Sequence, residues 1–212
     1  MKRLNIITGH FGSGKTEFAL NMAMQSKNKT AIVDMDTVNP YYRTADAADM
    51  LRDNGIRVIL PRYANTNVDI PALPSEIFSV FQNREETVFF DVGGDEDGAF
   101  ALGQFNRYFL EEGYEMYFVI NARRPLTQTP EGIIEILREV EEASRLRVTK
   151  LVNATNLGPE TNSEVILTGQ SVSEEVSRIT GIPIGFTAVK EDIDVLVDTP
   201  ILPLKLYIKS PF

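Results

Sequence analysis

The chain has 212 residues, a formal net charge of −9 and 43% hydrophobic residues, which is ordinary for one globular α/β domain. It contains no cysteine, which excludes disulfides and thiolate metal sites, and its one histidine, His10, leaves little material for histidine metal sites or Ser-His-Asp triads. The negative charge argues against general nucleic-acid binding, and no apolar run approaches membrane-spanning length, so we expect a cytoplasmic protein that binds neither nucleic acid nor membrane.

Apolar runs of strand length alternate with segments of helical period along the chain. Most of these runs lack polar alternation, which is typical of strands buried on both faces of a parallel sheet. The expected strands are 4–8, 30–34, 57–60, 87–92, 116–121, 149–153 and 183–186. With no repeat, low-complexity tract or linker, the pattern predicts a single doubly wound α/β domain over residues 1–212, with a mostly parallel sheet.

Two helices have recognisable ends. Thr129 is expected to cap a helix that opens at Pro130, and a capping box at 171–174 is expected to start a second helix. Gly181 and the proline that follows it should end this second helix. The tail at 201–212 carries two prolines and is a poor candidate for an amphipathic membrane helix.

Residues 9–16 read GHFGSGKT and satisfy G-x-x-x-x-G-K-[ST] at every required position, between an expected strand and a helix-favouring run at 17–25. Glycines let backbone N–H groups turn inward around an anion, and the helix N-terminus adds positive potential. Lys15 is expected to reach the β- and γ-phosphates, and the hydroxyl of Thr16 to hold Mg²⁺. The predicted nucleotide-binding residues of this loop are Gly9, Gly12, Ser13, Gly14, Lys15 and Thr16.

Carboxylates follow two of the expected strands. Asp34 and Asp36 come at the end of the second strand, and Asp91 ends a Walker B-like strand that continues to Gly94 as D-x-x-G. Acidic groups at the carboxyl ends of parallel strands lie at the ligand crevice of such folds. We expect Asp91 on the Mg²⁺ side, acting through water, and Asp36 to orient or deprotonate the attacking water. The backbone N–H of Gly94 is expected to meet the γ-phosphate, and Asp34 is either a supporting carboxylate or a cap.

The sixth strand runs into the sequence NATN at 153–156, where GTPases of related fold carry Asn-Lys-x-Asp. Guanine presents two donors that a carboxylate accepts together. Asn156 instead offers one acceptor and one donor, which matches the adenine edge. Asn153 and Asn156 are therefore predicted to bind the base and to favour ATP over GTP. The alternative is that both residues only make turns.

Together, the loop, the carboxylates and the strand ends resemble the MinD/ParA/CobQ-type family of P-loop ATPases over most of the chain, from Gly9 to 182–185. The resemblance implies a P-loop NTPase fold, with Asp36 assisting water attack and Asp91 at the magnesium site. It also implies that ATP binding closes a homodimer. The segment 34–43, DMDTVNPYYR, is similar to one in small bacterial ATP-binding proteins.

The chain departs from this family inside the loop. Members with the deviant loop carry a lysine that reaches the partner subunit's phosphates, where this chain has His10, and a glycine where it has Phe11. A histidine is mostly neutral at pH 7 and is a weaker substitute. Arg43 is one candidate replacement, because a guanidinium suits bidentate phosphate contact. An ordinary solvated arginine is the alternative.

Three functions fit these residues. The leading hypothesis is a Mg²⁺-dependent switch-type ATPase that acts on a partner protein, which the sequence does not identify. The alternative is a small-molecule kinase or an ATP-dependent ligase of the dethiobiotin-synthetase type, with an acceptor pocket from 65–73 or 95–107. A third hypothesis is a nucleotide-binding protein that hydrolyses nothing, which the intact Asp36 and Asp91 disfavour.

Overall fold

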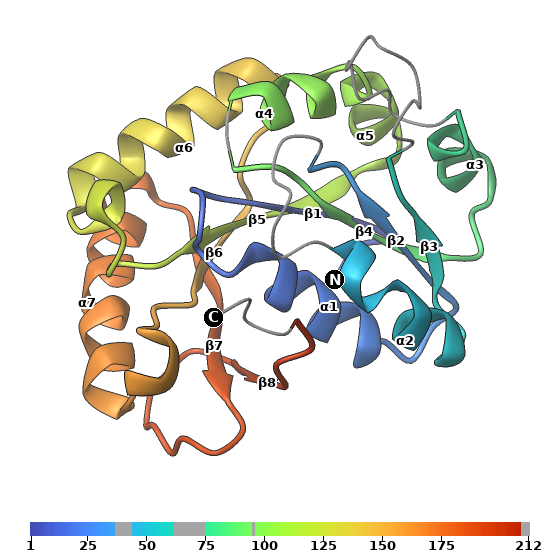
Figure 1. The fold of residues 1–212 in the computed structure, drawn as a ribbon. Coiled ribbons are helices and arrows are strands. Elements are labelled where there is room, and N and C mark those ends of the chain that lie inside the picture. The colour runs from blue at the N-terminus through green and yellow to red at the C-terminus, as the bar shows by residue number, and fades with distance from the viewer. Residues whose placement is uncertain (37–43, 62–74, 95, 209–212) are drawn as a thin grey trace, which may run out of the picture.

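The computed structural model describes residues 1–36, 44–61, 75–94 and 96–208, and within these ranges eight strands form a single sheet (Figure 1). The strand order is β3-β2-β4-β1-β5-β6-β7-β8, and every neighbouring pair is parallel. The strands are β1 (Leu4–Thr8), β2 (Thr30–Asp34), β3 (Arg57–Ile59), β4 (Thr87–Asp91), β5 (Tyr114–Ile120), β6 (Lys150–Asn153), β7 (Ile184–Lys190) and β8 (Ile201–Leu204). Because β1 lies inside the sheet, strands are added on both of its sides, and the carboxyl ends of β1, β2 and β4 meet at one edge.

Helices cover both faces of the sheet (Figure 1). One face packs against α1 (Lys15–Met24) and α2 (Ala48–Asp53), and the other packs against the remaining helices. These are α3 (Ile77–Gln82), α4 (Glu96–Gly103), α5 (Asn106–Glu112), α6 (Pro130–Ser144) and α7 (Ser163–Thr180), with 3₁₀ turns η1 (Thr44–Ala47), η2 (Pro125–Thr127) and η3 (Gly158–Glu160). The predicted doubly wound α/β fold is confirmed. None of the helices in the described ranges combines the length and apolar character that crossing a membrane requires.

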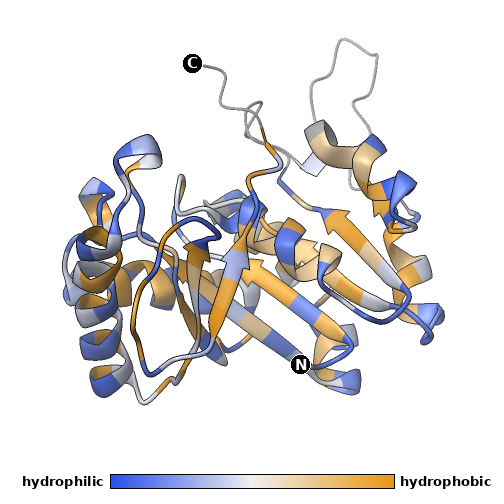
Figure 2. Ribbon diagram, turned by 90° about the horizontal axis from the view of Figure 1, so that it is seen from below, coloured by the Kyte–Doolittle hydropathy of each residue, from blue (hydrophilic) through white to orange (hydrophobic). Residues whose placement is uncertain are grey.

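The inner strands of the sheet have no side that faces solvent. Every residue of β1, β2 and β4 is buried, which explains why their sequences lack polar alternation. Alternate residues enter opposite core layers: Leu4 and Ile6 join the layer under α3 to α7, and Ile7 joins the layer under α1. Figure 2 shows hydrophobic colouring along the strands and hydrophilic colouring on the outer helices and turns.

The predicted ends of two helices are confirmed. The hydroxyl of Thr129 accepts a hydrogen bond from the N–H of Gly132 at 3.3 Å, and Pro130 opens α6. Gly181, in the left-handed conformation with φ of +74°, ends α7. Both ends depend on local contacts within a few residues, which is why the sequence predicts them.

The predicted start of α7 is wrong. The helix begins at Ser163, because the side chain of Asn162 accepts a hydrogen bond from the N–H of Val165 at 3.0 Å and caps it there. The hydroxyl of Ser171 instead donates to the carbonyl of Leu167 at 3.2 Å, inside the continuing helix. The capping-box pattern at 171–174 is therefore a mid-helix sequence.

The sequence analysis missed β8. This strand pairs with β7 at one end of the sheet and contains Pro203. Proline cannot donate to a ladder, yet it is tolerated in an edge strand. Pro203, one of the two prolines that make the tail a poor membrane helix, therefore lies in a strand, and residues 209–212 lie outside the described part of the chain.

The end of β8 and the residues that follow it lie along α1, and we call residues 203–208 the 203–208 strap. Three polar side chains spaced four residues apart, two in α1 and one directly after it, hydrogen-bond the backbone of the strap. The bonds join Gln25 to the carbonyl of Pro203, Asn21 to the N–H and carbonyl of Lys205, and Glu17 to the N–H groups of Tyr207 and Ile208, at 2.8–3.1 Å. The strap thus runs antiparallel to α1, toward the end of the helix that follows the phosphate loop.

Candidate functional site

The phosphate loop lies between β1 and α1, at the carboxyl edge of the sheet. Gly9 has φ of +140°, and a Cβ there would lie 2.3 Å from the carbonyl oxygen of Val119 in β5. Gly14, with φ of +91°, is the residue from which α1 starts. Only glycine takes these conformations at low cost. The loop is therefore fixed at both ends, and the amino end of α1 opens into it.

The inside of the loop holds buried polar groups. The carbonyl of His10 accepts hydrogen bonds from Nζ of Lys15 at 3.1 Å and from the N–H of Ser13 at 3.2 Å. The side chain of Lys15 is buried. The hydroxyls of Thr8 and Ser13 are buried too, and neither has a hydrogen-bond partner among the described residues. Buried polar groups with unfilled bonding capacity are rare in native proteins, and their presence here fits an anionic ligand.

Asp91 ends β4 and is 2% exposed. The hydroxyl of Thr44 donates to its Oδ2 at 3.0 Å, and the hydroxyl of Thr16 also hydrogen-bonds this carboxylate. Burial raises the pKa of Asp91 to about 6; the charge of Lys15 and the two hydroxyls oppose the rise, and the charge of Asp36 adds to it. The carboxylate therefore faces the phosphate loop, beside the residue predicted to hold Mg²⁺.

The other two carboxylates lie beside Asp91. Asp34 is its register partner on β2 and is almost completely buried. Oδ1 of Asp34 accepts a hydrogen bond from the N–H of Asp36 at 3.0 Å, which fixes the backbone where β2 leaves the sheet. Asp36 is close enough to Asp91 to raise its pKa. The structure thus brings the three carboxylates together, with Asp34 holding the backbone of Asp36.

Gly94 lies directly against the phosphate loop. A Cβ built on it would be 2.7 Å from Nζ of Lys15 and 2.7 Å from the backbone nitrogen of Phe11. No larger residue fits at this position without moving the loop. The role of Gly94 toward the γ-phosphate stays a prediction, and its position beside Lys15 agrees with that prediction.

The cations around the loop differ from the expected ones. Burial and the charges of Lys15 and Arg124 lower the pKa of His10, which keeps this residue neutral at pH 7. Arg43 lies outside the described residues. Arg124 was not among the predicted site residues, yet its Nε donates to the carbonyl of Gly12 at 2.9 Å. The available signal was its place in the loop that follows β5, at the carboxyl edge of the sheet where ligands bind in such folds.

Asn153, one of the two residues predicted to bind the base, is fully buried. Its amide donates to the carbonyl of Ile166 at 3.1 Å and to the side chain of Gln170 at 3.2 Å. Its Oδ1 accepts from the N–H of Thr155 at 3.1 Å. Both amide hydrogens are therefore used within the protein, and the geometry favours a role in positioning the loop after β6.

Asn156, the other predicted base contact, lies on the side of that loop nearest the phosphate loop. A Cβ on Gly14 would be 4.0 Å from its Nδ2. That Nδ2 donates to the carbonyl of Ala154 at 2.9 Å, and the buried side chain of Asn121 hydrogen-bonds the backbone N–H and carbonyl of Asn156. The backbone of Asn156 is thus held from two directions, and its contact with a base stays a prediction.

The residues present suit a magnesium ion. The described part of the chain contains no cluster of three or more acidic, histidine or cysteine side chains that would bind a metal alone. Mg²⁺ generally uses one or two protein ligands and completes its shell with waters and phosphate oxygens. The hydroxyl of Thr16 beside the carboxylate of Asp91 supplies such a pair.

Of the two stretches expected to form an acceptor pocket, the structure describes only part of the second. Residues 65–73 and residue 95 lie outside the described residues. Residues 96–107 form α4 and the start of α5, and Ala99, Leu102 and Phe105 are buried in the core. The described part of the second stretch therefore consists mainly of helices that pack on one face of the sheet.

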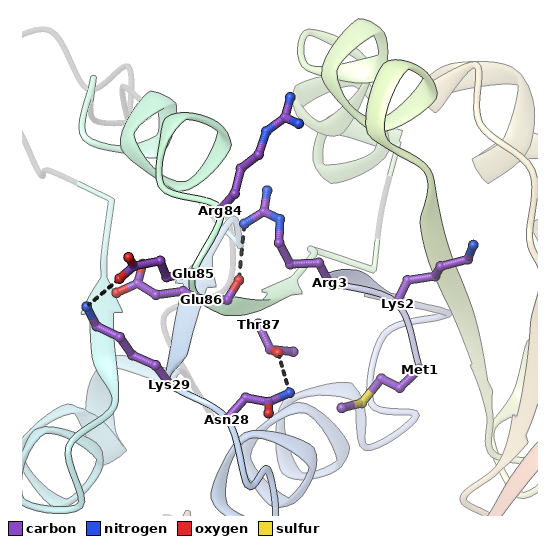
Figure 3. Close-up of a pocket in the computed structure, with 9 residues that line it drawn as sticks. All are labelled: Met1, Lys2, Arg3, Asn28, Lys29, Arg84, Glu85, Glu86 and Thr87. Atoms are coloured by element: carbon purple, nitrogen blue, oxygen red, sulfur yellow. Dashed lines mark hydrogen bonds and ion pairs between the residues drawn. The ribbon is translucent and has the colours of Figure 1, made fainter.

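A hollow of about 420 Å³ lies at the opposite edge of the sheet, at the amino ends of the strands (Figure 3). Its lining residues are Met1, Lys2, Arg3, Asn28, Lys29, Arg84, Glu85, Glu86 and Thr87. Several of the polar groups bind one another: Lys29 pairs with Glu85 at 3.9 Å, and Arg3 donates to the carbonyl of Glu86 at 3.1 Å. Part of the polar lining of this hollow is therefore already partnered within the protein.

Comparison with known proteins supports the fold. No protein-family model matches the chain, and no curated protein matches it. The solved structure of cell division protein FtsY from Thermotoga maritima matches with a TM-score of 0.57 and 20% identity, over 89% of this chain and 62% of that one. Signal recognition particle receptor FtsY from Elizabethkingia anophelis gives a TM-score of 0.56 at 16% identity in its complex with GDP, over 89% and 58% of the two chains. Another structure of that receptor gives 0.55 at 19% identity, over 90% and 60%.

The chain spans 58–62% of the length of these three structures. At 16–20% identity, the likeness establishes the fold. The chain therefore has the P-loop NTPase fold that the loop at residues 9–16 predicts, and the narrower resemblance to MinD/ParA/CobQ-type ATPases stays a prediction.

Proposed function

We propose that the chain is a Mg²⁺-dependent P-loop ATPase of the switch type, which passes the difference between its triphosphate and diphosphate states to a partner protein. One observation carries the proposal. Lys15 and Asp91, both buried, interact at the phosphate loop, and Thr16 hydrogen-bonds the same carboxylate. This is the donor set that binding a nucleoside triphosphate with its metal requires.

Each residue has a role in the proposed reaction. Lys15 and the loop N–H groups bind the phosphate oxygens, and Thr16 and Asp91 hold the metal, which when bound offsets phosphate charge. Asp36 orients the attacking water and accepts its proton. The water oxygen bonds to the γ-phosphorus while the bond to the bridging oxygen breaks, which leaves ADP and inorganic phosphate.

We propose adenine as the base, because an asparagine amide offers one acceptor and one donor. We propose Asn156 as its contact, because Asn156 lies beside Gly14 of the phosphate loop, whereas Asn153 is fully buried. An FtsY structure of similar fold holds GDP, so the choice calls for a direct test. Wild-type protein should bind ATP more tightly than GTP in a calorimetric titration, and Asn156→Asp should narrow or reverse the ratio. Equal affinities in the wild type would remove the support for an adenine site.

Exposed apolar side chains surround the phosphate loop and support docking of a partner. Phe11 in the loop is 58% exposed, Leu126 in η2 is 62% exposed, and Leu157, beside Asn156, is 42% exposed. Apolar groups gathered on a surface are typical of protein contacts. We propose that this rim receives a partner protein or a second copy of the chain in the triphosphate state. Sedimentation with and without ATP distinguishes the second copy from another partner.

Phosphate release from ATP, with no other substrate present, tests the function. Turnover in the wild type and none in Lys15→Ala supports a switch-type ATPase. Release that requires a small-molecule acceptor would instead indicate the kinase or ligase. Binding of ATP without any release, with or without Mg²⁺, would contradict hydrolysis and leave a nucleotide-binding protein.

A further inference from the structure

Arg124 reaches the phosphate loop because its backbone is held in place. β5 pairs in parallel with β1, with Phe118 opposite Thr8, so the residues after β5 lie beside the start of the loop. The carbonyl of the fully buried Asn121 accepts hydrogen bonds from the Thr127 hydroxyl at 2.6 Å and from the N–H of Arg124 at 3.2 Å. These bonds set the direction of the segment that carries Arg124.

The segment is also restricted by its sequence and by a second contact. The N–H of Ala122 donates to the hydroxyl of Thr155 at 3.1 Å, which ties the segment to the loop after β6. Pro125 follows Arg124 and favours an extended backbone before it, as the observed φ of −92° and ψ of 142° show. Arg124 is therefore an exposed side chain on an anchored backbone.

The guanidinium of Arg124 lies against the loop at a residue that has no side chain. Its Nε donates to the carbonyl of Gly12 at 2.9 Å, and a Cβ on Gly12 would be 3.1 Å from Nε and 3.3 Å from Cζ. Among the described residues, Nε is the one guanidinium nitrogen of Arg124 with a hydrogen-bond partner. The terminal nitrogens carry four further N–H groups, the part of an arginine that binds phosphate oxygens in pairs.

The phosphate loop itself carries one positively charged side chain, and Arg124 adds a second positive charge beside it. Lys15 is the cation that the motif itself supplies, and the other titratable side chain of residues 9–16 is His10. The surroundings of His10 favour its neutral form. Several negative charges develop or persist on a triphosphate during transfer, and cations fixed beside it stabilise them.

We propose that Arg124 is the second cation of the phosphate loop, supplied by the same chain. Nε braces the loop at Gly12, and the terminal nitrogens bind oxygen atoms of the phosphate chain. This inference rests on the proposed function and adds a residue to it. It also gives the site a complete set of cations without a contribution from a second subunit.

The test measures the affinities of ATP, ADP and AMP for three variants. Arg124→Gln should weaken ATP binding about 10- to 100-fold, the loss expected for a charge-assisted contact, and should weaken AMP binding much less. Arg124→Lys keeps the charge and should recover most of the affinity. Arg123→Gln removes the exposed neighbouring arginine and should change the ATP affinity less than about twofold. Melting temperatures without nucleotide confirm that each variant is folded.

Other outcomes would overturn the inference. Equal effects of Arg124→Gln and Arg123→Gln would show that Arg124 has no special part. Equal losses in Arg124→Gln and Arg124→Lys, or equal losses for all three nucleotides, would show that the residue only shapes the loop. Recovery of turnover on mixing Lys15→Ala with Arg124→Gln would show that the arginine acts on the other subunit's nucleotide, whereas we expect none. A wild type that binds no nucleotide contradicts the proposed function itself.

Discussion

The two edges of the sheet treat buried charge in opposite ways. At the amino edge, Arg57 pairs with the buried Glu86 at 2.6 Å, and Arg3 pairs with Glu112. At the carboxyl edge, burial opposes the charge on Asp91 strongly enough to raise its pKa to about 6. The ion pairs at the amino edge therefore stabilise the fold. At the carboxyl edge, the protein compensates the negative charge of Asp91 incompletely, and a bound cation would compensate it better.

The difference shows how to recognise a site in such a molecule. The hollow of Figure 3 is large, but several of its polar groups bind one another. The phosphate loop combines the buried Lys15 with the buried hydroxyls of Thr8 and Ser13, which have no partner among the described residues. Buried charge together with unfilled bonding capacity, and not volume, therefore points to the candidate site. Four substitutions separate the two edges.

Asp36→Ala should have the largest effect. The variant should still bind ATP with Mg²⁺ but hydrolyse it about 100- to 10,000-fold more slowly, which is the usual contribution of a general base. Single-turnover phosphate release measures the rate. Asp34→Ala is the matched control, because it removes a neighbouring buried carboxylate of the same strand end that is assigned only a supporting role. It should reduce stability or metal affinity more than the chemical step, and the opposite pattern would reverse the two assignments.

Arg57→Ala should destabilise the amino edge without touching the site. Loss of the guanidinium leaves the Glu86 carboxylate buried without its partner, which should lower the free energy of unfolding by about 2–3 kcal/mol. Nucleotide affinity should stay at the wild-type value. Urea unfolding and a titration check both points. Arg107→Ala, which breaks an exposed pair with Glu111, should leave the unfolding curve nearly unchanged.

Lys15→Ala should show the reverse behaviour. ATP affinity should fall about 10- to 100-fold or more, because a charge-assisted contact to phosphate is lost. Unfolding without nucleotide should change much less than in Arg57→Ala, since Asp91 can take up a proton when its cationic neighbour is removed. A titration with unchanged affinity would show that the loop does not hold phosphate.

Asp91→Asn should stabilise the protein without its ligands. The pKa of Asp91 is about 6 in the fold against an ordinary value of 3.8, so ionised Asp91 opposes folding above pH 6 and this penalty disappears below pH 4. The variant should gain up to about 3 kcal/mol at pH 8, and the wild type should approach it as the pH falls from 6 to 4. Thermal unfolding at several pH values measures the difference. A constant difference would show that Asp91 does not titrate in this range.

The sequence predicts the elements whose signals are local. Seven of the eight described strands, the phosphate loop, and the positions of Asp36 and Asp91 follow from apolar runs and motif spacing. The roles of those residues remain predictions until the substitutions are made. The predicted start of α7 was wrong because two sequences in this region resemble helix caps. The side chain of Asn162, and not the one at residue 171, forms the cap.

The sequence does not predict contacts between distant segments. Arg124 meets Gly12 across 112 positions, and Thr44 meets Asp91 across 47, so neither pair has a spacing rule. The edge strand β8 was missed because Pro203 breaks the strand pattern, although an edge tolerates it. These contacts depend on the strand order, which places β1 between β4 and β5 and which the sequence patterns do not reveal.

The 203–208 strap has a consequence for synthesis of the chain on the ribosome. Its bond from Tyr207 to Glu17 joins residues 190 positions apart. At 5–20 residues per second, α1 is made roughly 10–40 s before the strap. During that interval Glu17, Gln25 and the Oδ1 of Asn21 lack their partners in the strap, and the helix behind the phosphate loop lacks its cover. The phosphate-loop end of the molecule is therefore among the first parts to be made and among the last to be completed.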